Sequence, residues 1–589
     1  MNYELNAAQN KPKVSAWKAI RALAPLLSGE QTILIYAGLV TLANSAINLV
    51  APLLIAHVVD TYILTKQFGG VITFAFILLG LLLVGLFTSY AQTRLMGGMG
   101  QRILFKLRTN IFAKLQELPV AFFNANKTGD LISRINNDTD KLNQFFSQTL
   151  VQFVGSIVIM VGAAIFVLVI NFKLGLAALA PAVLLLFFTQ ILSPWVKRSN
   201  AASLTTTGGL SAEVSESLNN FKVVVAFNRR DFFRKRFEVS NDENYRAAIK
   251  AGIANNTFTP VFGFSSNIAQ LIVLTYGVYL ISIGHFTLGL LIGFISYVSN
   301  FYNPLRQLAA LWANFQVALA GWDRISAILQ MRNDMVVLPS ASTDVTTSTS
   351  SALLEFKDVS FRYVADKDVL RHVNFTLERG KTYALVGPTG GGKTTTASLM
   401  ARLYDPSEGV VYLNGKDIAT YESADRTQKI GFILQDPMLF SGTVRENILY
   451  GNETYKDFSN EQLVQVIKHA GLESLLLRFD GGLEARVATS GDALSLGQKQ
   501  LIAFMRAVLR NPEVLILDEA TANIDTVTEQ MLEDILKKLP KETTKVIIAH
   551  RLNTIENADA IFFVNGGEIT PAGSMEHAVD MLLHGKRES

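Results

Sequence analysis

The sequence predicts a helical domain that spans a membrane, followed by a soluble α/β domain that binds a phosphorylated ligand. Three observations predict this division. The first half holds six long runs of apolar residues, the second half alternates short apolar strands with helical segments, and a glycine-rich phosphate-binding pattern follows one of those strands. A chain of 589 residues is also too long for a single hydrophobic core.

Composition supports a membrane protein and excludes several kinds of site. Hydrophobic residues make up 49% of the chain and charged residues only 17%, against about 25% in soluble proteins. The net charge of +4 is small, so we expect no nucleic-acid partner. The chain has no cysteine, which excludes disulfides, thiolate nucleophiles and Cys-ligated zinc. The polar residues 1–13 do not resemble a cleavable signal peptide.

Residues 14–27 place apolar and basic side chains on opposite faces of a helix, which is typical of a helix lying in the membrane interface. A bilayer core requires about 20 apolar residues per helix. Runs without Asp, Glu, Lys or Arg that meet this length are 31–59, 68–93, 150–172, 174–196 and two within 251–305, which breaks near Gly284. We therefore expect six transmembrane helices.

Charge in the loops predicts the orientation. The loops at 60–67, 173 and 284–287 are short, whereas those at about 94–149 and 197–250 are long and rich in Lys and Arg. The positive-inside rule assigns the basic loops, and with them both termini and the α/β domain, to the cytoplasm. Few helix breakers interrupt the long loops, so we expect the membrane helices to continue into them.

Domain boundaries follow from composition. Residues 1–30 form an N-terminal polar segment and the interfacial helix, 31–332 the six-helix domain, 333–352 a Ser/Thr-rich linker and 353–589 the α/β domain. Strands are expected at 353–356, 382–386, 429–434, 514–517, 545–549 and 560–564.

The phosphate-binding pattern lies between a strand and a helix expected at 395–403. Its glycines let backbone N–H groups turn towards phosphates at the start of a helix. Lys393 is expected to contact the β- and γ-phosphates, and Thr394 to offer its hydroxyl to Mg²⁺. Residues expected to bind nucleotide here are Gly387, Pro388, Thr389, Gly390, Gly391, Gly392, Lys393, Thr394 and Thr395.

A second motif ends another buried strand. Residues 514–517 are apolar and are followed by Asp518 and Glu519. Adjacent carboxylates at the end of a buried strand suit a site that handles a cation and a proton. We expect Asp518 to coordinate Mg²⁺ and Glu519 to act as the general base that polarises the attacking water.

With these motifs, residues 353 to about 583 resemble the nucleotide-binding domain of ATP-binding-cassette (ABC) proteins. The family's signature motif is matched by residues 494–498, in which Leu496 stands where the family usually has glycine. The resemblance implies that ATP and Mg²⁺ are the cofactors. It also implies further roles: Tyr363 stacks on adenine, Gln435 senses Mg²⁺ and the attacking water, Asp525 belongs to a loop that crosses the dimer interface, His550 holds the γ-phosphate, and Ser495, Gly497 and Gln498 cap the ATP of a second cassette.

The first half is similar to the exporter-type (type IV) transmembrane domain of ABC transporters. Residues 122–134 resemble its first intracellular loop, and the second loop would place a coupling helix near 218–228. In the family, short coupling helices in such loops dock on the nucleotide-binding domain.

The resemblance implies a half-transporter that works as a dimer and exports amphipathic or hydrophobic compounds, such as drugs, lipids or peptides. An importer built on the exporter fold and an ATP-gated membrane protein remain alternatives. In asymmetric members of the family, one chain keeps the catalytic glutamate while its own signature motif changes, and its partner does the reverse. This chain has Glu519 and a signature altered at Leu496, which slightly favours a heterodimer over a homodimer. The expected location is a bacterial inner membrane.

Overall fold

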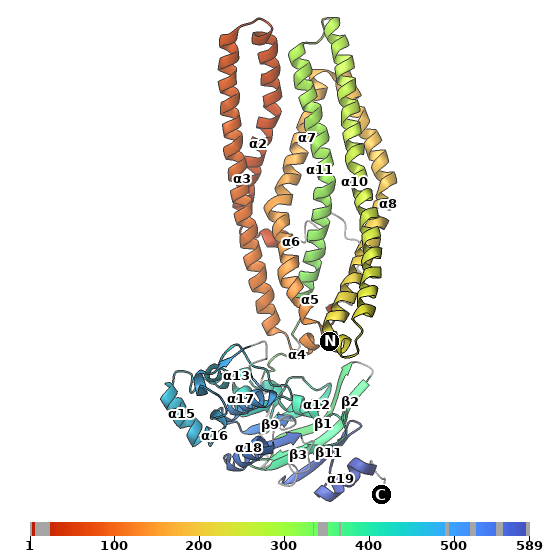
Figure 1. Cartoon of the computed structure of the whole chain (residues 1–589). Coiled ribbons are helices and arrows are strands. Elements are labelled where there is room, and N and C mark those ends of the chain that lie inside the picture. Colours follow the sequence, from red (N-terminus) through yellow and green to blue (C-terminus); the bar gives the residue numbers. More distant parts are fainter. Residues whose placement is uncertain are drawn as a thin grey trace. The chain divides into compact units, whose positions relative to one another are not determined.

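The computed structural model contains two compact units (Figure 1). It describes residues 3–5, 24–333, 335–339, 352–364, 367–488, 494–518, 526–548 and 558–584. The helical unit comprises Glu4–Gln116 and Asn126–Met331, and the cassette unit comprises Met1–Tyr3, Glu117–Ala125 and Arg332–Ser589. The interfacial helix expected at 14–27 lies mostly outside the described residues, of which 24–27 form a short 3₁₀ helix.

Long helices build the helical unit. They are α2 (Gln31–Val58, extended by a π turn to Ile63), α3 (Phe68–Glu117), α7 (Leu150–Ile170), α8 (Phe172–Asn219), α10 (Arg230–Ser282) and α11 (Leu288–Leu329). Three of them reach 48 to 53 residues, longer than a bilayer requires, as the unbroken loop sequences predicted.

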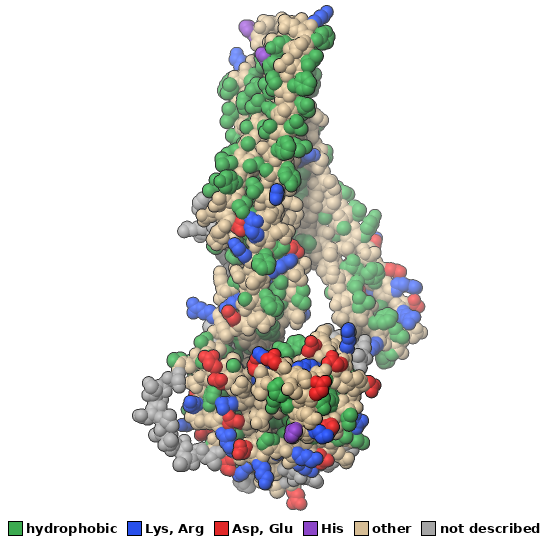
Figure 2. Space-filling model, turned by 90° about the vertical axis from the view of Figure 1, so that its left-hand side faces the viewer, with side chains coloured by type: hydrophobic (Ala, Val, Ile, Leu, Met, Phe, Trp, Pro, Cys, Tyr) green, Lys and Arg blue, Asp and Glu red, His purple; other side chains and the backbone are tan. Residues whose placement is uncertain are grey.

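Within the described residues, five helices are long and apolar enough to cross a membrane: 31–63, 68–117, 128–170, 172–219 and 230–282. The expected sixth span falls in α11, which is not among these five, so the count of six stays a prediction. Large apolar side chains of α3, such as Phe76 and Phe87, are more than 60% exposed. Figure 2 shows hydrophobic side chains over much of this unit's surface, which is typical of a surface that lipid covers.

Small residues allow close helix packing inside the helical unit. A Cβ at Gly289 of α11 would lie 2.1 Å from the carbonyl oxygen of Ala56, and one at Gly293 would lie 3.0 Å from that of Pro52. Glycines four residues apart therefore bring α11 against α2, as in other membrane helix pairs. The hydroxyl of Tyr302 on α11 donates to the Ala178 carbonyl of α8 over 2.9 Å, so this buried polar group is satisfied.

Short helices interrupt the two long loops. The first loop contains α4 (Val120–Ala125), α5 (Thr128–Ser133) and α6 (Thr139–Gln144), and the second contains α9 (Phe221–Ala226). Short helices thus lie at both positions where the resemblance placed coupling helices.

A buried cluster of charges joins the first of these loops to α11. Asp138 is 3% exposed and accepts hydrogen bonds from Arg324 Nε over 2.7 Å and from Lys141 Nζ over 3.1 Å. Arg134 is 2% exposed and donates to Asp130 and to the Arg324 carbonyl. Removing one partner of such a cluster leaves a buried charge without an opposite charge beside it, and this lowers the stability of the folded protein.

Replacing Asp138 with alanine is therefore expected to destabilise the helical unit by about 3 kcal/mol, the low end for a broken buried ion pair, because Arg324 keeps some contact with water. A clear fall in melting temperature in detergent would measure this. Asp140→Ala is the matched control, since Asp140 is 57% exposed in its pair with Arg108. An exposed pair contributes about 1 kcal/mol or less, so equal shifts in the two variants would contradict the assignment.

Two main sheets form the cassette unit. The first is antiparallel, in the order β2 (Lys367–Glu378), β1 (Ala352–Val364), β4 (Glu408–Leu413), β5 (Lys416–Asp417). The second follows the order β12 (Glu568–Pro571), β11 (Ala560–Asn565), β3 (Thr382–Val386), β10 (Thr544–Ile548), β9 (Val514–Asp518), β6 (Ile430–Ile433). Strands β11, β3, β10, β9 and β6 are parallel. A strand lies at each of the six expected positions, with ends shifted by a residue or two and β1 much longer than expected.

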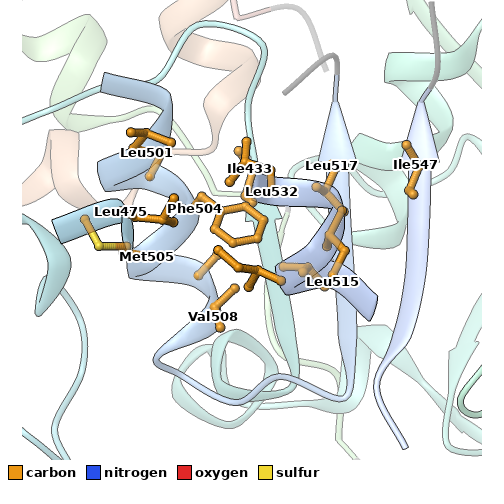
Figure 3. Close-up of a cluster of buried hydrophobic side chains, with 14 of the residues drawn as sticks. Ile433, Leu475, Leu501, Phe504, Met505, Val508, Leu515, Leu517, Leu532 and Ile547 are labelled. Atoms are coloured by element: carbon orange, nitrogen blue, oxygen red, sulfur yellow. The ribbon is translucent and has the colours of Figure 1, made fainter. Parts of the chain in front are cut away.

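Helices cover both faces of the parallel sheet. Alternate residues of β9 enter two different cores: Leu515 and Leu517 join one, and Val514 and Ile516 join the other. The first core is filled from α17 (Leu496–Val508), whose buried Phe504 lies between this helix and β9 (Figure 3). The second is filled from α12 (Lys393–Met400) and the antiparallel sheet. Burial on both faces explains why these strands read as continuous apolar runs.

Candidate functional site

The parallel strands bring the sequence motifs to one edge of the sheet. In the register, Ile548 of β10 is paired with both Leu385 of β3 and Asp518 of β9, and Ile433 of β6 is paired with Leu517. The carboxyl ends of these four strands therefore lie side by side. In open α/β sheets this edge is where ligands bind.

The glycines after β3 are dictated by close approach of the backbone. Gly387 has φ +150°, and a Cβ there would lie 2.0 Å from the carbonyl oxygen of Val564 on β11. A Cβ at Gly391 would lie 2.5 Å from the same oxygen. Gly392 caps α12 with φ +114°. Because a side chain would displace the loop, these positions require glycine, and α12 begins with its free N–H groups at the loop.

Lys393 is 5% exposed, and its ammonium donates to the carbonyls of Gly387 over 2.8 Å and Pro388 over 3.0 Å. The charge is thus held over the loop that would surround the phosphates. Thr394, whose side chain is exposed, donates from Oγ1 to Oδ1 of Asp518 over 3.3 Å, and Asp518 is 1% exposed. A hydroxyl beside a carboxylate is an oxygen donor pair that fits Mg²⁺, which completes its shell with phosphate oxygens and water.

An aromatic wall stands beside the phosphate loop. The Tyr363 hydroxyl lies 3.1 Å from Thr395 Oγ1, so this ring is tied to the first turn of α12. Phe361 and Tyr404 pack against it edge-on, with ring centroids 4.8 and 5.2 Å away. Tyr363 is 52% exposed, which leaves ring surface free to stack on a base.

The helix α4 joins this wall. Asn124 of α4 donates to the Tyr404 hydroxyl over 2.5 Å, and burial raises the pKa of Tyr404, so the hydroxyl stays protonated. Phe122 of the same helix is fully buried and packs edge-on against Tyr3. Helix α4 therefore reaches Tyr363 through a single intervening ring, that of Tyr404.

Tyr404→Phe is expected to keep basal ATP hydrolysis and to reduce its stimulation by transported compounds by about fivefold, which corresponds to one lost hydrogen bond. The ring remains against Tyr363, but α4 loses its polar contact. ATPase assays with and without a stimulating compound would measure the change.

Tyr412→Phe is the matched control, because no hydrogen bond of its hydroxyl is found within the described residues. Adding Asn124→Ala to Tyr404→Phe should cause no further loss. An additive loss would show that the two side chains act separately.

The signature residues cap α17. Ser495 Oγ accepts from the Gln498 backbone N–H over 3.2 Å, and Gln498 Oε1 accepts from the Ser495 N–H over 3.0 Å, so the two form a capping box. The first turn of a helix leaves N–H groups and the positive end of its dipole available to an anion. Leu496 occupies the first helical position and is 39% exposed, so it lies on the surface of the unit and not in its core.

Three expected site residues, Glu519, Asp525 and His550, lie outside the described residues. Strand β9 ends immediately before the first of them. Gln435 is exposed two residues after β6, at the same sheet edge as the phosphate loop.

Sequence reasoning missed two residues of this site, Tyr404 and Asn124. Tyr404 lies four residues after the end of the phosphate-loop helix α12, but a single tyrosine there is indistinguishable from a core residue. Its partner Asn124 is 280 positions away, so nothing local could have paired them.

Comparison with known proteins finds matches to both halves of the chain. Residues 34–305 match the family model described as ABC transporter transmembrane region, and residues 370–522 match the one described as ABC transporter. The chain is 31% identical over 560 residues to an uncharacterized ABC transporter ATP-binding protein of Bacillus subtilis, which covers 95% of this chain and 92% of the relative.

Two further relatives have more specific names. A fatty acid ABC transporter ATP-binding/permease protein of Mycobacterium tuberculosis is 34% identical over 84% of this chain and 77% of its own length. A multidrug resistance ABC transporter ATP-binding and permease protein of Lactococcus lactis is 33% identical over 82% of this chain and 81% of its own length. The chain therefore belongs to the ABC transporters, and it is an ATPase coupled to transport that carries a transmembrane region and an ATP-binding domain in one polypeptide.

Proposed function

We propose that this chain is one half of an exporter that moves amphipathic or hydrophobic compounds across a bacterial inner membrane by alternating access. One observation carries the proposal: the chain holds a single phosphate loop and a single signature helix, and the signature residues Ser495 and Leu496 are exposed at the surface. A second cassette can therefore supply the missing side of each ATP site.

In this proposal Glu519 is the general base, His550 holds the γ-phosphate and Gln435 senses the nucleotide. Thr394, Gln435 and Asp518 surround Mg²⁺. Nucleotide is bound by Tyr363, residues 387–395 and Gln435, and on the opposing cassette by Ser495, Gly497, Gln498 and the Asp525 loop. The domain boundaries are 31–332 for the membrane domain and 353–589 for the cassette, with the cassette and both termini in the cytoplasm.

The substrate class rests on the helical unit and on the relatives. The expected membrane runs carry no formal charge, so no fixed ion-binding carboxylate is expected within them. The named relatives are a fatty acid transporter and a multidrug resistance transporter, and both names fit compounds that partition into lipid. A partner with an intact signature fits Leu496 slightly better than a second identical copy does.

The second short-helix segment, α9 and the residues that flank it, carries apolar side chains that are not packed within the helical unit. Around α9, Phe221 and Val223 are just over half exposed and Phe227 is 75% exposed. Apolar side chains gathered at the tip of a loop are typical of a surface that another protein covers. We propose that a cassette covers them in the assembled transporter.

The decisive experiment is ATP hydrolysis and mass of the chain purified alone and reconstituted in lipid. A dimer with steady turnover and ATP-dependent uptake of a fluorescent lipophilic dye into inverted vesicles would establish a self-sufficient exporter. An inactive chain that becomes active with a co-expressed second half-transporter would establish a heterodimer. ATP hydrolysis without dye or lipid movement in either preparation would overturn export.

A further inference from the structure

We propose that a groove between α8 and α10 binds the anionic headgroup of a long-chain amphiphile, with the acyl chain lying along the exposed apolar face of α8. The proposal rests on the proposed function, because it assigns a substrate or lipid class to that transporter. The groove belongs entirely to the helical unit and has a volume of about 460 Å³. Its lining residues are Arg198, Ser199, Ala202, Thr206, Glu243, Arg246, Ala247 and Lys250.

The first argument is charge. Three lining residues are basic and one, Glu243, is acidic. Arg246 is paired through Nε with Asp242 over 2.8 Å. Within the described residues no ion pair or hydrogen bond is found for Arg198, Lys250 or Glu243. After the Arg246–Asp242 pair, the lining therefore carries two cations against one carboxylate, and its net charge is positive. A carboxylate or phosphate would balance that charge.

The second argument is that the groove is held open by its own walls. Asn200 and Asn255 exchange hydrogen bonds of 2.9 and 3.0 Å between α8 and α10. Further from the apolar runs, Thr206 and Thr207 both donate to Asn244 Oδ1, over 3.2 and 2.9 Å. These polar contacts fix the spacing of the helices, while the small residues Ala202 and Ala247 leave space between them. The charges are therefore presented at a preformed slot.

The third argument is position. The uncharged run of α8 ends at Val196 and that of α10 begins at Ala251, so Arg198 and Lys250 mark the level at which the bilayer gives way to water. Amphiphiles hold their headgroups at that level. Two of the basic residues expected there by the positive-inside rule, Arg198 and Lys250, thus line the same groove.

The fourth argument is a matching apolar track. Phe188, Ile191 and Trp195 are between 42% and 56% exposed. They precede Ser199 on α8 at spacings that place them on the same helix face as the groove. Ser199 lies eleven positions after Phe188, a helical rise of about 16 Å, which covers most of the length of a long acyl chain.

Direct binding tests the proposal without relying on transport. The full chain is placed in nanodiscs of zwitterionic phosphatidylcholine, with Trp17, Trp312 and Trp322 replaced by phenylalanine so that Trp195 is the only fluorophore of its kind. The probe is stearate brominated at carbons 6 and 7, because bromine quenches a tryptophan that it contacts. We expect saturable quenching by the acid and only weak, non-saturating quenching by its methyl ester.

Arg198→Gln and Lys250→Gln should each weaken binding of the brominated acid by about tenfold, as expected for a lost hydrogen bond to a charged group. Lys197→Gln is the matched control: it removes the same charge one residue away, at a position that does not line the groove. Basal ATPase activity and elution volume should be unchanged in all three variants.

Equal quenching by acid and ester, or equal weakening in the Lys197 and Arg198 variants, would overturn the site, since either result would mean partitioning or diffuse surface charge. Adding phosphatidylglycerol to the nanodiscs identifies the source. Competition with the acid means that the groove also holds a bilayer phospholipid, and no competition means that it selects the single-chain acid; both results support a headgroup site. Loss of ATP-driven uptake with retained saturable binding would refute the proposed function and leave the site standing.

Discussion

Replacing Lys393 with alanine is expected to lower ATP hydrolysis by about 10²- to 10³-fold, the usual cost of removing one preorganised donor from a developing charge. The ammonium is almost fully buried and is held by two loop carbonyls, over 2.8 and 3.0 Å. It is therefore positioned before nucleotide arrives. When ATP binds, the Lys393 ammonium needs only to turn from those carbonyls to the phosphate oxygens. The described part of the loop has no other buried cation that could take its place.

The measurement is steady-state ATPase activity in lipid, together with binding of a fluorescent ATP analogue, which should weaken as well. Lys538→Ala is a suitable control. Lys538 is the last residue of α18, so this substitution removes an equal charge from the same unit without changing the phosphate loop. Melting temperatures separate a local effect from unfolding. Hydrolysis within tenfold of the parent protein would contradict the assigned role.

The site edge was predictable because it depends on local signals. The sequence shows one buried strand followed by the glycine pattern and another followed by Asp518, which correspond to β3 and β9. Because the carboxyl ends of parallel strands lie at the same edge of a sheet, the two motifs must come together there. The sequence predicted the glycines from the turn of the backbone around phosphates, and the structure adds a steric reason, since a Cβ at Gly387 or Gly391 would collide with the Val564 carbonyl.

The antiparallel sheet of β1, β2, β4 and β5 was not predicted beyond the start of β1. Strand β2 alternates buried and exposed residues and carries charged side chains on its outer face, so it shows no apolar run. The contacts Asn124–Tyr404 and Asp138–Arg324 could not be predicted from the sequence either, because each joins residues more than 180 positions apart. Periodicity reports which face of an element is buried, not which element buries it.

Glu519→Gln is expected to lower hydrolysis by about 10²- to 10⁴-fold, the range for loss of a general base, while ATP binding is retained. The substitution leaves in place the described groups that we propose bind the phosphates and Mg²⁺: Lys393 over the loop, and Thr394 beside Asp518. Binding and chemistry should therefore separate in this variant, whereas Lys393→Ala impairs both.

The comparison with Asp518→Asn makes the test specific. Asp518 is buried against Thr394, so its amide variant should weaken the dependence of nucleotide binding on Mg²⁺, which Glu519→Gln should leave intact. Hydrolysis would be followed in a dimer in which every cassette carries the glutamine. Near-normal turnover there would mean that another group activates the water, and the adjacent carboxylates at the end of β9 would then serve the metal alone.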